Sequence, residues 1–179
     1  MKTLNQLIYS DSQTQIEVWI KREDLIHPFI SGNKYRKLKY NLEFAKNNNF
    51  KSILTFGGAY SNHIAAVAFA GKLYGFETIG VIRGEELENQ IKGNPTLNFA
   101  QENGMQFHFI SRSDYQKKEQ PDFLNNLLAK FNNPYIIPEG GTNILAIKGC
   151  EEILTLEDSK FNYIACAVGT GGTISGIIN

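Results

Sequence analysis

Lys34 is the residue of this chain whose type and position could support covalent chemistry. It lies in the run SGNKYRK, directly after Gly32 and Asn33, at the expected first turn of a helix. The positive end of a helix dipole disfavours a cation, so it lowers the pKa of a lysine amine placed there. A lower pKa increases the neutral fraction of the amine, which is the form that a Schiff base requires. A solvated lysine of a basic helix is the ordinary alternative, and we assign Lys37 and Lys39 to that class.

A glycine-rich loop, GTGGT, follows an apolar run near the end of the chain. Glycines allow backbone N–H groups to turn inward around an anion, and the helix expected after the loop adds partial positive charge. The hydroxyls of Thr170 and Thr173 are further donors. The loop lacks the lysine of a Walker A motif and has Ile174 where the dinucleotide fingerprint requires glycine. The pattern predicts a phosphate site, and a tight turn that merely needs glycine is the structural alternative.

A third loop, GGAYSNH, places Ser61 and Asn62 at the start of a helix that follows a buried strand. Capping of that helix is the default role of serine or asparagine at such a position. A nucleophile elbow would read G-x-S-x-G, but Ala59 and His63 occupy the flanking positions, which argues against a hydrolase serine. We interpret His63 as a helix residue rather than a base. The other two histidines give no support to a metal cluster.

Strands and helices alternate along the chain and would bring these loops together. The expected strands lie at 16–20, 52–56, 78–84, 106–110, 134–138 and 162–168. The expected helices lie at 34–48, 62–75, 94–104, 120–131 and 142–157, with one more after GTGGT. This alternation is typical of an α/β protein with parallel strands and crossover helices, and near-continuous apolar strands fit a sheet covered on both faces. Ligands bind at the carboxyl ends of such strands, where all three loops stand.

Composition narrows the classes of partner. The 179 residues carry 18 Lys and Arg against 18 Asp and Glu, so the formal charge is zero and a nucleic-acid partner is not expected. The two cysteines, Cys150 and Cys166, are too few for a disulfide framework. The sequence shows no signal peptide and no apolar run long enough to span a membrane, so we expect a cytoplasmic protein without a membrane partner.

Taken together, four motifs resemble those of a known family. SGNKYRKLKY, GGAYSNH, IPEGGTN and AVGTGGTISG match, in order and spacing, the pyridoxal-phosphate (PLP) dependent 1-aminocyclopropane-1-carboxylate deaminases and D-cysteine desulfhydrases. The resemblance covers essentially the whole chain and about the first half, or somewhat more, of a family member, so we expect a C-terminally truncated member. It implies the two-lobed parallel-sheet α/β architecture of the tryptophan-synthase-like fold, fold type II, with an incomplete large lobe. The small lobe would span 37–144, and 1–36 with 145–179 would form part of the large, PLP-binding lobe.

The resemblance also implies roles for individual residues. Lys34 matches the lysine that binds PLP covalently and later moves protons. Asn62 matches the residue that hydrogen-bonds the phenolic oxygen of the cofactor, and Ser61 matches a serine with a nucleophilic or proton-handling role near the substrate carboxylate. The substrate side would consist of Tyr60, Ser61, Asn62 and His63. The phosphate loop would consist of Gly169, Thr170, Gly171, Gly172 and Thr173.

The activity that the resemblance implies is that of a PLP-dependent lyase or deaminase. Its substrate would be a small amino acid of the D-cysteine or 1-aminocyclopropane-1-carboxylate type, its products ammonia and a keto acid, and its full-length form a homodimer. Relatives commonly carry Gln before the Ser-Asn pair and Thr-Arg after SNH or SNQ, whereas this chain has Tyr60 and Ile64-Ala65. These positions adjoin the substrate, so the preferred amino acid stays open.

Three alternatives compete with this interpretation. A non-catalytic, truncated PLP- or phosphate-binding module would keep Lys34 and GTGGT without turnover. A β-replacing amino-acid synthase of the same fold would carry a Ser-x-Gly-Asn loop, whereas here serine directly precedes asparagine. A nucleic-acid binder using the lysines of KYRKLK conflicts with the zero net charge.

Overall fold

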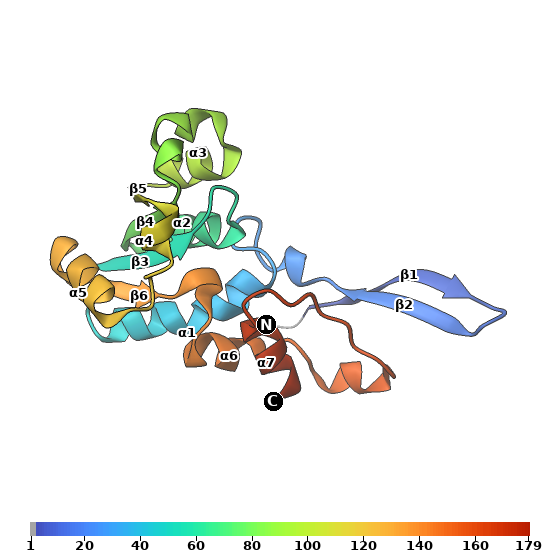
Figure 1. Ribbon diagram of the computed structural model, residues 1–179. Helices are drawn as coiled ribbons and strands as arrows, with labels where there is room; N and C mark the ends of the chain where they lie inside the picture. Colours follow the sequence, from blue (N-terminus) through green and yellow to red (C-terminus); the bar gives the residue numbers. More distant parts are fainter. Residues whose placement is uncertain (1–2) are drawn as a thin grey trace.

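The computed structural model describes residues 3–179, which form an α/β body and an N-terminal hairpin that projects from it (Figure 1). The hairpin consists of β1 (Asn5–Asp11) and β2 (Ile16–Lys21), paired antiparallel with a register shift between Leu7 and Tyr9. The expected strand at 16–20 is thus confirmed as β2. β1 is not evident from the sequence, because the bulge interrupts the alternation of apolar and polar residues that marks a strand.

A four-stranded parallel sheet forms the centre of the body. Its strands are β3 (Ser52–Gly57), β4 (Glu77–Arg83), β5 (Met105–Ile110) and β6 (Tyr135–Ile137). Their order is β5-β4-β3-β6, and every neighbouring pair is parallel, as the α/β prediction requires. The chain builds outward from β3 to β5 and then returns to the other side of β3. The order therefore reverses between β3 and β6, and such a switch point opens a crevice at the carboxyl ends of the two strands.

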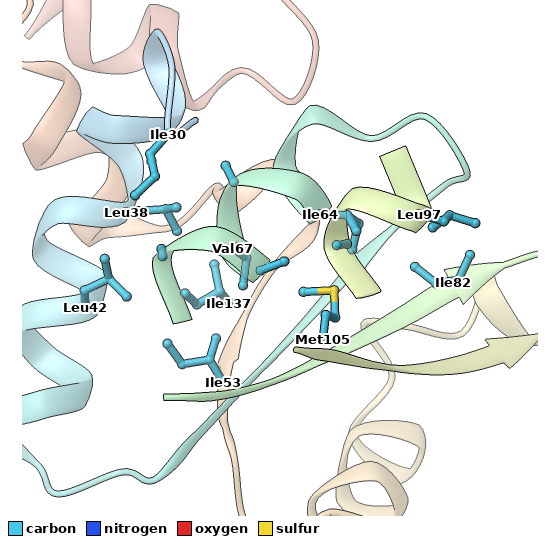
Figure 2. Packing of buried hydrophobic residues seen from close by; sticks show 14 residues of the cluster. Ile30, Leu38, Leu42, Ile53, Ile64, Val67, Ile82, Leu97, Met105 and Ile137 are labelled. Carbon is cyan, nitrogen blue, oxygen red and sulfur yellow. The ribbon is translucent and has the colours of Figure 1, made fainter. Parts of the chain in front are cut away.

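Helices cover both faces of the sheet, because alternate strand residues point to opposite sides. On one face Ile53 and Ile82 pack with residues of α1 (Asn33–Asn47), α2 (Asn62–Tyr74) and α3 (Pro95–Glu102), as Figure 2 shows for Leu38, Val67 and Leu97. On the other face Leu54, Phe56, Ile79 and Val81 pack with α4 (Arg112–Tyr115) and α5 (Pro121–Lys130). The apolar runs of β3 and β4 are confirmed as strands buried on both sides.

A buried amide network fixes α1 against β6 and against α6 (Ile144–Cys150). The fully buried Asn41 accepts hydrogen bonds from the Tyr135 hydroxyl and the Asn143 amide, each at 2.7 Å. Asn143 in turn caps α6 by accepting from the Ala146 N–H at 2.9 Å. α6 packs against α7 (Gly172–Ile178), so the segment before α7 lies next to the start of α1 (Figure 1).

Two predicted elements differ from the structure. Residues 162–168 are mostly exposed and form no ladder with any strand in the described range, so the predicted strand there is wrong. An apolar run is not enough for a strand, because a strand also needs a hydrogen-bonded neighbour. The helix expected at 142–157 ends at Cys150. Thr155 and Asp158 form a capping box there and start a separate 3-10 turn, η4 (Leu156–Lys160).

The remaining regular elements are three short 3-10 segments, η1 (Glu23–Leu25), η2 (Glu85–Gly93) and η3 (Glu139–Gly141). Among residues 3–179, no helix combines the length and the apolar character needed to cross a bilayer.

Asp158 joins the hairpin to the body. Its carboxylate accepts hydrogen bonds from the Lys21 ammonium on β2, the Asn5 amide on β1 and the Thr155 backbone N–H, each at 2.7 Å. Burial opposes the charged form, but these bonds outweigh it and lower the pKa of Asp158 to about 2.

We expect Asp158→Asn to lower the free energy of unfolding by about 2 kcal/mol, because it leaves the Lys21 ammonium without its buried partner. Urea denaturation measures the change, and Glu119→Gln, an exposed carboxylate outside the network, is the matched control. Since the pKa of Asp158 is depressed, its contribution is complete above pH 4 and is lost as the pH falls through about 2. Equal stability of the two variants would show that the Asp158 network does not stabilise the attachment of the hairpin.

Candidate functional site

The first predicted loop, SGNK, leads into α1 and is bonded directly to the GTGGT loop. Gly32 precedes the helix with φ 59°, and Asn33 is the first helical residue. The Asn33 amide donates to the Thr173 hydroxyl at 2.8 Å. Asn33, Lys34 and Lys37 line a cavity of about 250 Å³ together with Gly140, Ile174 and most of the segment from Ala167 to Thr173. Two loops that lie about 140 residues apart in sequence are thus parts of one site.

Lys34 has the depressed basicity that the sequence indicates. Partial burial is the main cause, the positive charge of Lys37 is the second, and together they lower the pKa of Lys34 to about 8. No hydrogen bond joins the Lys34 Nζ to another residue in the described part of the chain. A substantial fraction of this amine is therefore neutral near physiological pH, which is the form that attacks a carbonyl group.

Lys37 is not the solvated lysine that we assigned from the sequence. It is 1% exposed, and its ammonium donates to the Gly140 carbonyl at 3.0 Å, the Thr142 hydroxyl at 3.1 Å and the Thr170 hydroxyl at 3.4 Å. The prediction for Lys39 is confirmed, since that side chain is exposed and pairs with Glu152. The sequence spacing could have distinguished Lys37 from Lys39. Residues three apart share a helix face, so Lys37 lies on the same face as Lys34.

The charge around these lysines is not balanced within the site. All three acceptors of Lys37 are neutral oxygens, and no carboxylate in residues 3–179 forms an ion pair with Lys34 or Lys37. Burial lowers the pKa of Lys37 as well. Two neighbouring cations without a counter-charge, beside threonine hydroxyls that can donate, are the donor set that a phosphate group requires.

The GTGGT loop approaches Lys37 closely because it carries glycine. A Cβ at Gly172 would lie 2.9 Å from the Thr142 Oγ1 and 3.0 Å from the Lys37 Nζ, so a larger residue would displace the cation. Thr170 and Thr142 are hydrogen-bonded to each other. The GTGGT loop therefore lies against α1 and against the segment that follows β6. That segment, PEGGT, supplies two of the oxygens that accept hydrogen bonds from Lys37.

The third loop lies at the other side of the switch point. Ser61 is the residue that caps α2, accepting from the Ile64 N–H at 3.3 Å, and Asn62 is the first residue of the helix. Tyr60 is 74% exposed, and Asn62 is also exposed. None of Tyr60, Ser61 and Asn62 belongs to the wall of the 250 Å³ cavity.

His63 connects this loop to the lysines. It is confirmed as a helix residue and is buried, with its Nε2 2.8 Å from the Thr55 hydroxyl. A Cβ at Gly141 would lie 3.0 Å from the His63 Cε1 and 3.6 Å from the Lys37 Cβ, so the histidine ring and the lysine stem meet at this glycine. The sequence shows no signal for this contact, which depends on the adjacency of β3 and β6.

Within residues 3–179 no three side chains of His, Cys, Asp or Glu gather in a way that could hold a metal ion.

Comparison with known proteins agrees with this donor set. A family model described as pyridoxal-phosphate dependent enzyme matches residues 3–179. The chain is 34% identical to the mitochondrial bifunctional D-cysteine desulfhydrase/1-aminocyclopropane-1-carboxylate deaminase of Arabidopsis thaliana, over 90% of this chain and 44% of that protein. It is 25% identical to a D-cysteine desulfhydrase of Serratia proteamaculans, over 90% and 52%. The chain thus spans about half the length of the curated relatives it matches.

A solved structure shows the same fold. The crystal structure of an ACC deaminase homologue superposes with a TM-score of 0.77 at 27% identity, covering 99% of this chain and 55% of that one.

We predict that the amine of Lys34 reacts with an acylating reagent at neutral pH in the cofactor-free protein. Its pKa of about 8 means that acylation of the Lys34 peptide should rise with pH to a midpoint near 8. Mass spectrometry of digests labelled from pH 6 to 11 measures this midpoint, and the exposed Lys72 in the same digest is the internal reference. A Lys34 profile that coincides with that of Lys72 would contradict the perturbed site.

Proposed function

Because the chain belongs to the family of pyridoxal-phosphate dependent enzymes, we propose that it carries the cofactor site of a lyase or deaminase acting on a small amino acid. The observation that carries the proposal is the pair of lysines without a counter-charge on one face of α1. Lys34 has a depressed pKa and no bonded partner among the described residues, whereas Lys37 is held by three neutral oxygens. One lysine suits a covalent bond to an aldehyde and the other suits a phosphate anion.

In this proposal Lys37 and the GTGGT loop bind the phosphate. The Lys37 ammonium supplies the formal charge, and the hydroxyls of Thr170 and Thr173 can donate beside it. The proposed phosphate loop is Gly169, Thr170, Gly171, Gly172 and Thr173. Neutralisation of the site by a dianion would remove much of the cost of burying Lys37.

Lys34 and Ser61 are the proposed catalytic residues. When bound, PLP supplies a ring that stabilises negative charge developing beside the substrate nitrogen. Lys34 anchors the cofactor and, once its amine is free, accepts and returns a proton, for which a pKa near 8 is well suited. Ser61 accepts a hydrogen bond from the Ile64 N–H, so its own hydroxyl proton is available to a substrate group.

The substrate side of the proposal consists of Tyr60, Ser61, Asn62 and His63, with the Asn62 amide directed to the phenolic oxygen of PLP. The Arabidopsis relative is named for D-cysteine and for 1-aminocyclopropane-1-carboxylate, which supports one of these amino acids as substrate and ammonia with a keto acid as products. The division into a lobe at 37–144 and a lobe at 1–36 with 145–179, and dimer formation by the full-length protein, belong to the same proposal. Residues 1 and 2 lie outside the described part of the chain.

Covalent binding is the first test of the proposal. With PLP added, we expect a visible absorbance band and, after borohydride reduction, an adduct on the Lys34 peptide that mass spectrometry identifies. Lys34→Ala should abolish this adduct. An adduct that persists at another lysine would remove Lys34 from its proposed role.

Phosphate recognition gives a sharper test, because it separates two neighbouring lysines. Lys37→Met should weaken binding of PLP by about 10- to 100-fold, the loss expected for a charge-assisted hydrogen bond, and should leave binding of pyridoxal, which has no phosphate, unchanged. Lys39→Met is the matched control on the same helix, since Lys39 pairs with Glu152 on the surface. Equal losses for both ligands would mean that Lys37 shapes the fold rather than binding phosphate.

Turnover decides between an enzyme and a binding module. Keto acid release is measured with D-cysteine and with 1-aminocyclopropane-1-carboxylate, with the L-enantiomer of cysteine as comparison. Release that falls at least 10-fold in Ser61→Ala while the Lys34 adduct still forms would support the assigned roles. A Lys34 adduct without release from any substrate would favour the non-catalytic module.

A further inference from the structure

His63 has a hydrogen-bonding pattern that fixes which of its ring nitrogens carries the proton. Its Nε2 lies 2.8 Å from the Thr55 Oγ1 on β3. The single hydroxyl hydrogen of Thr55 is already donated to the Ile137 carbonyl on β6, at 2.7 Å. Thr55 must therefore accept from His63, so Nε2 carries the hydrogen and Nδ1 presents a lone pair.

The Nδ1 lone pair is buried and has no partner. His63 is 2% exposed, and no donor in the described part of the chain bonds to its Nδ1. Buried polar atoms without a partner are rare and call for an explanation, and an unmade bond to a ligand or to a mobile side chain is a common one. The ring is therefore not an ordinary satisfied core histidine.

The unpaired atom lies beside Gly141, close to the stem of Lys37, and the charges of both lysines act on its ring. A Cβ at Gly141 would lie 3.4 Å from the His63 Nδ1 and 3.6 Å from the Lys37 Cβ, and Gly141 has φ +74°. The absence of a side chain there leaves this edge of the ring uncovered on the side of α1. Lys34 lies one turn before Lys37 on the same helix face.

Of the two lysines only Lys34 has capacity for another acceptor. The Lys37 ammonium already donates to three oxygens, whereas no described residue accepts from the Lys34 Nζ. Burial, with the positive charges of Lys34 and Lys37 in second place, lowers the pKa of His63 to about 3. The imidazole consequently stays neutral at physiological pH and acts as an acceptor that does not take up the proton.

We propose that His63 is a positioning residue, whose Nδ1 accepts a hydrogen bond from the free Lys34 amine after the lysine side chain, which has no bonded partner among the described residues, rotates toward the ring. The inference rests on the proposed role of Lys34 as the reactive lysine. The bond would hold the Lys34 Nζ at a fixed place in the site, and the Thr55 and Ile137 contacts would hold the ring. The hydroxyl–carbonyl pair offers no exit for a proton, so His63 orients the amine and does not relay its charge.

The test measures Lys34 in the cofactor-free protein and therefore does not depend on turnover. Three titratable side chains act on this amine or lie within its proposed reach: Lys37 on its own helix, Cys150 on α6 and His63 on α2. An acceptor at Nδ1 favours the ammonium form, so His63→Leu should lower the midpoint of Lys34 acylation by about one unit or more. A merely structural histidine, neutral at these pH values, would leave the midpoint unchanged, and this result would overturn the proposal.

A conservative variant and a spectroscopic reading complete the test. His63→Asn, whose side-chain oxygen can occupy the place of Nδ1, should restore most of the wild-type midpoint. Nitrogen-15 NMR of the wild-type protein should show the hydrogen on Nε2, and a hydrogen on Nδ1 would contradict the proposal. If His63→Leu does not fold, Thr55→Val asks the same question, because it frees the ring to exchange tautomers and should lower the midpoint in part.

Failure of this inference is distinguishable from failure of the proposed function. A Lys34 adduct with PLP together with an unchanged midpoint in His63→Leu would reject only the role of His63. A shifted midpoint without a PLP adduct would keep the contact between His63 and Lys34 and reject the cofactor site.

Discussion

The burial of the Lys37 ammonium without a counter-ion is the constraint on which the site depends. Taking such a charge out of water costs several kcal/mol, and neutral oxygens recover only part of that cost. The oxygens come from Gly140, Thr142 and Thr170, that is, from the segment after β6 and from the loop before α7. These segments must converge on α1 for the lysine to be tolerated. An anion bound beside Lys37 would supply the counter-charge that the described residues lack.

The convergence is a consequence of strand order. β6 lies beside β3, so the loop that follows β3 and the segment that follows β6 emerge at the same edge of the sheet. The same adjacency places the Thr55 hydroxyl within 2.7 Å of the Ile137 carbonyl, and that bond sets the tautomer of His63. Asn41 then fixes α1 against β6 through the Tyr135 hydroxyl. The adjacency of β3 and β6 therefore orients the lysine helix and the histidine together, and the packing of α7 against α6 brings the glycine-rich loop to them.

The sequence was sufficient to predict the α/β class, most of the strands and helices, the lowered pKa of Lys34 and the joining of SGNK to GTGGT. These features depend on local patterns, namely apolar periodicity, glycine in loops and a lysine at a helix start. It was not sufficient for Lys37, because whether a helical lysine is solvated depends on what packs against that face. The strand prediction for residues 162–168 was wrong for a related reason, because an apolar run does not indicate whether a neighbouring strand is present to pair with it. The unpaired Nδ1 of His63 could not be predicted from the sequence. It depends on contacts among His63, Thr55 and Ile137, which lie on three different elements.

The two lysines differ in a way that divides their tasks. Both lie on one face of α1 and both are less basic than an exposed lysine, with burial as the main cause. Lys37 is surrounded by acceptors and can change its bonding only at the expense of three hydrogen bonds. Lys34 has none of these bonds among the described residues, so its amine can form and break a covalent bond without disturbing the fold. In the proposed function Lys37 would be the cation for the phosphate and Lys34 the amine for the aldehyde, one helical turn apart and of the same residue type in two different sets of contacts.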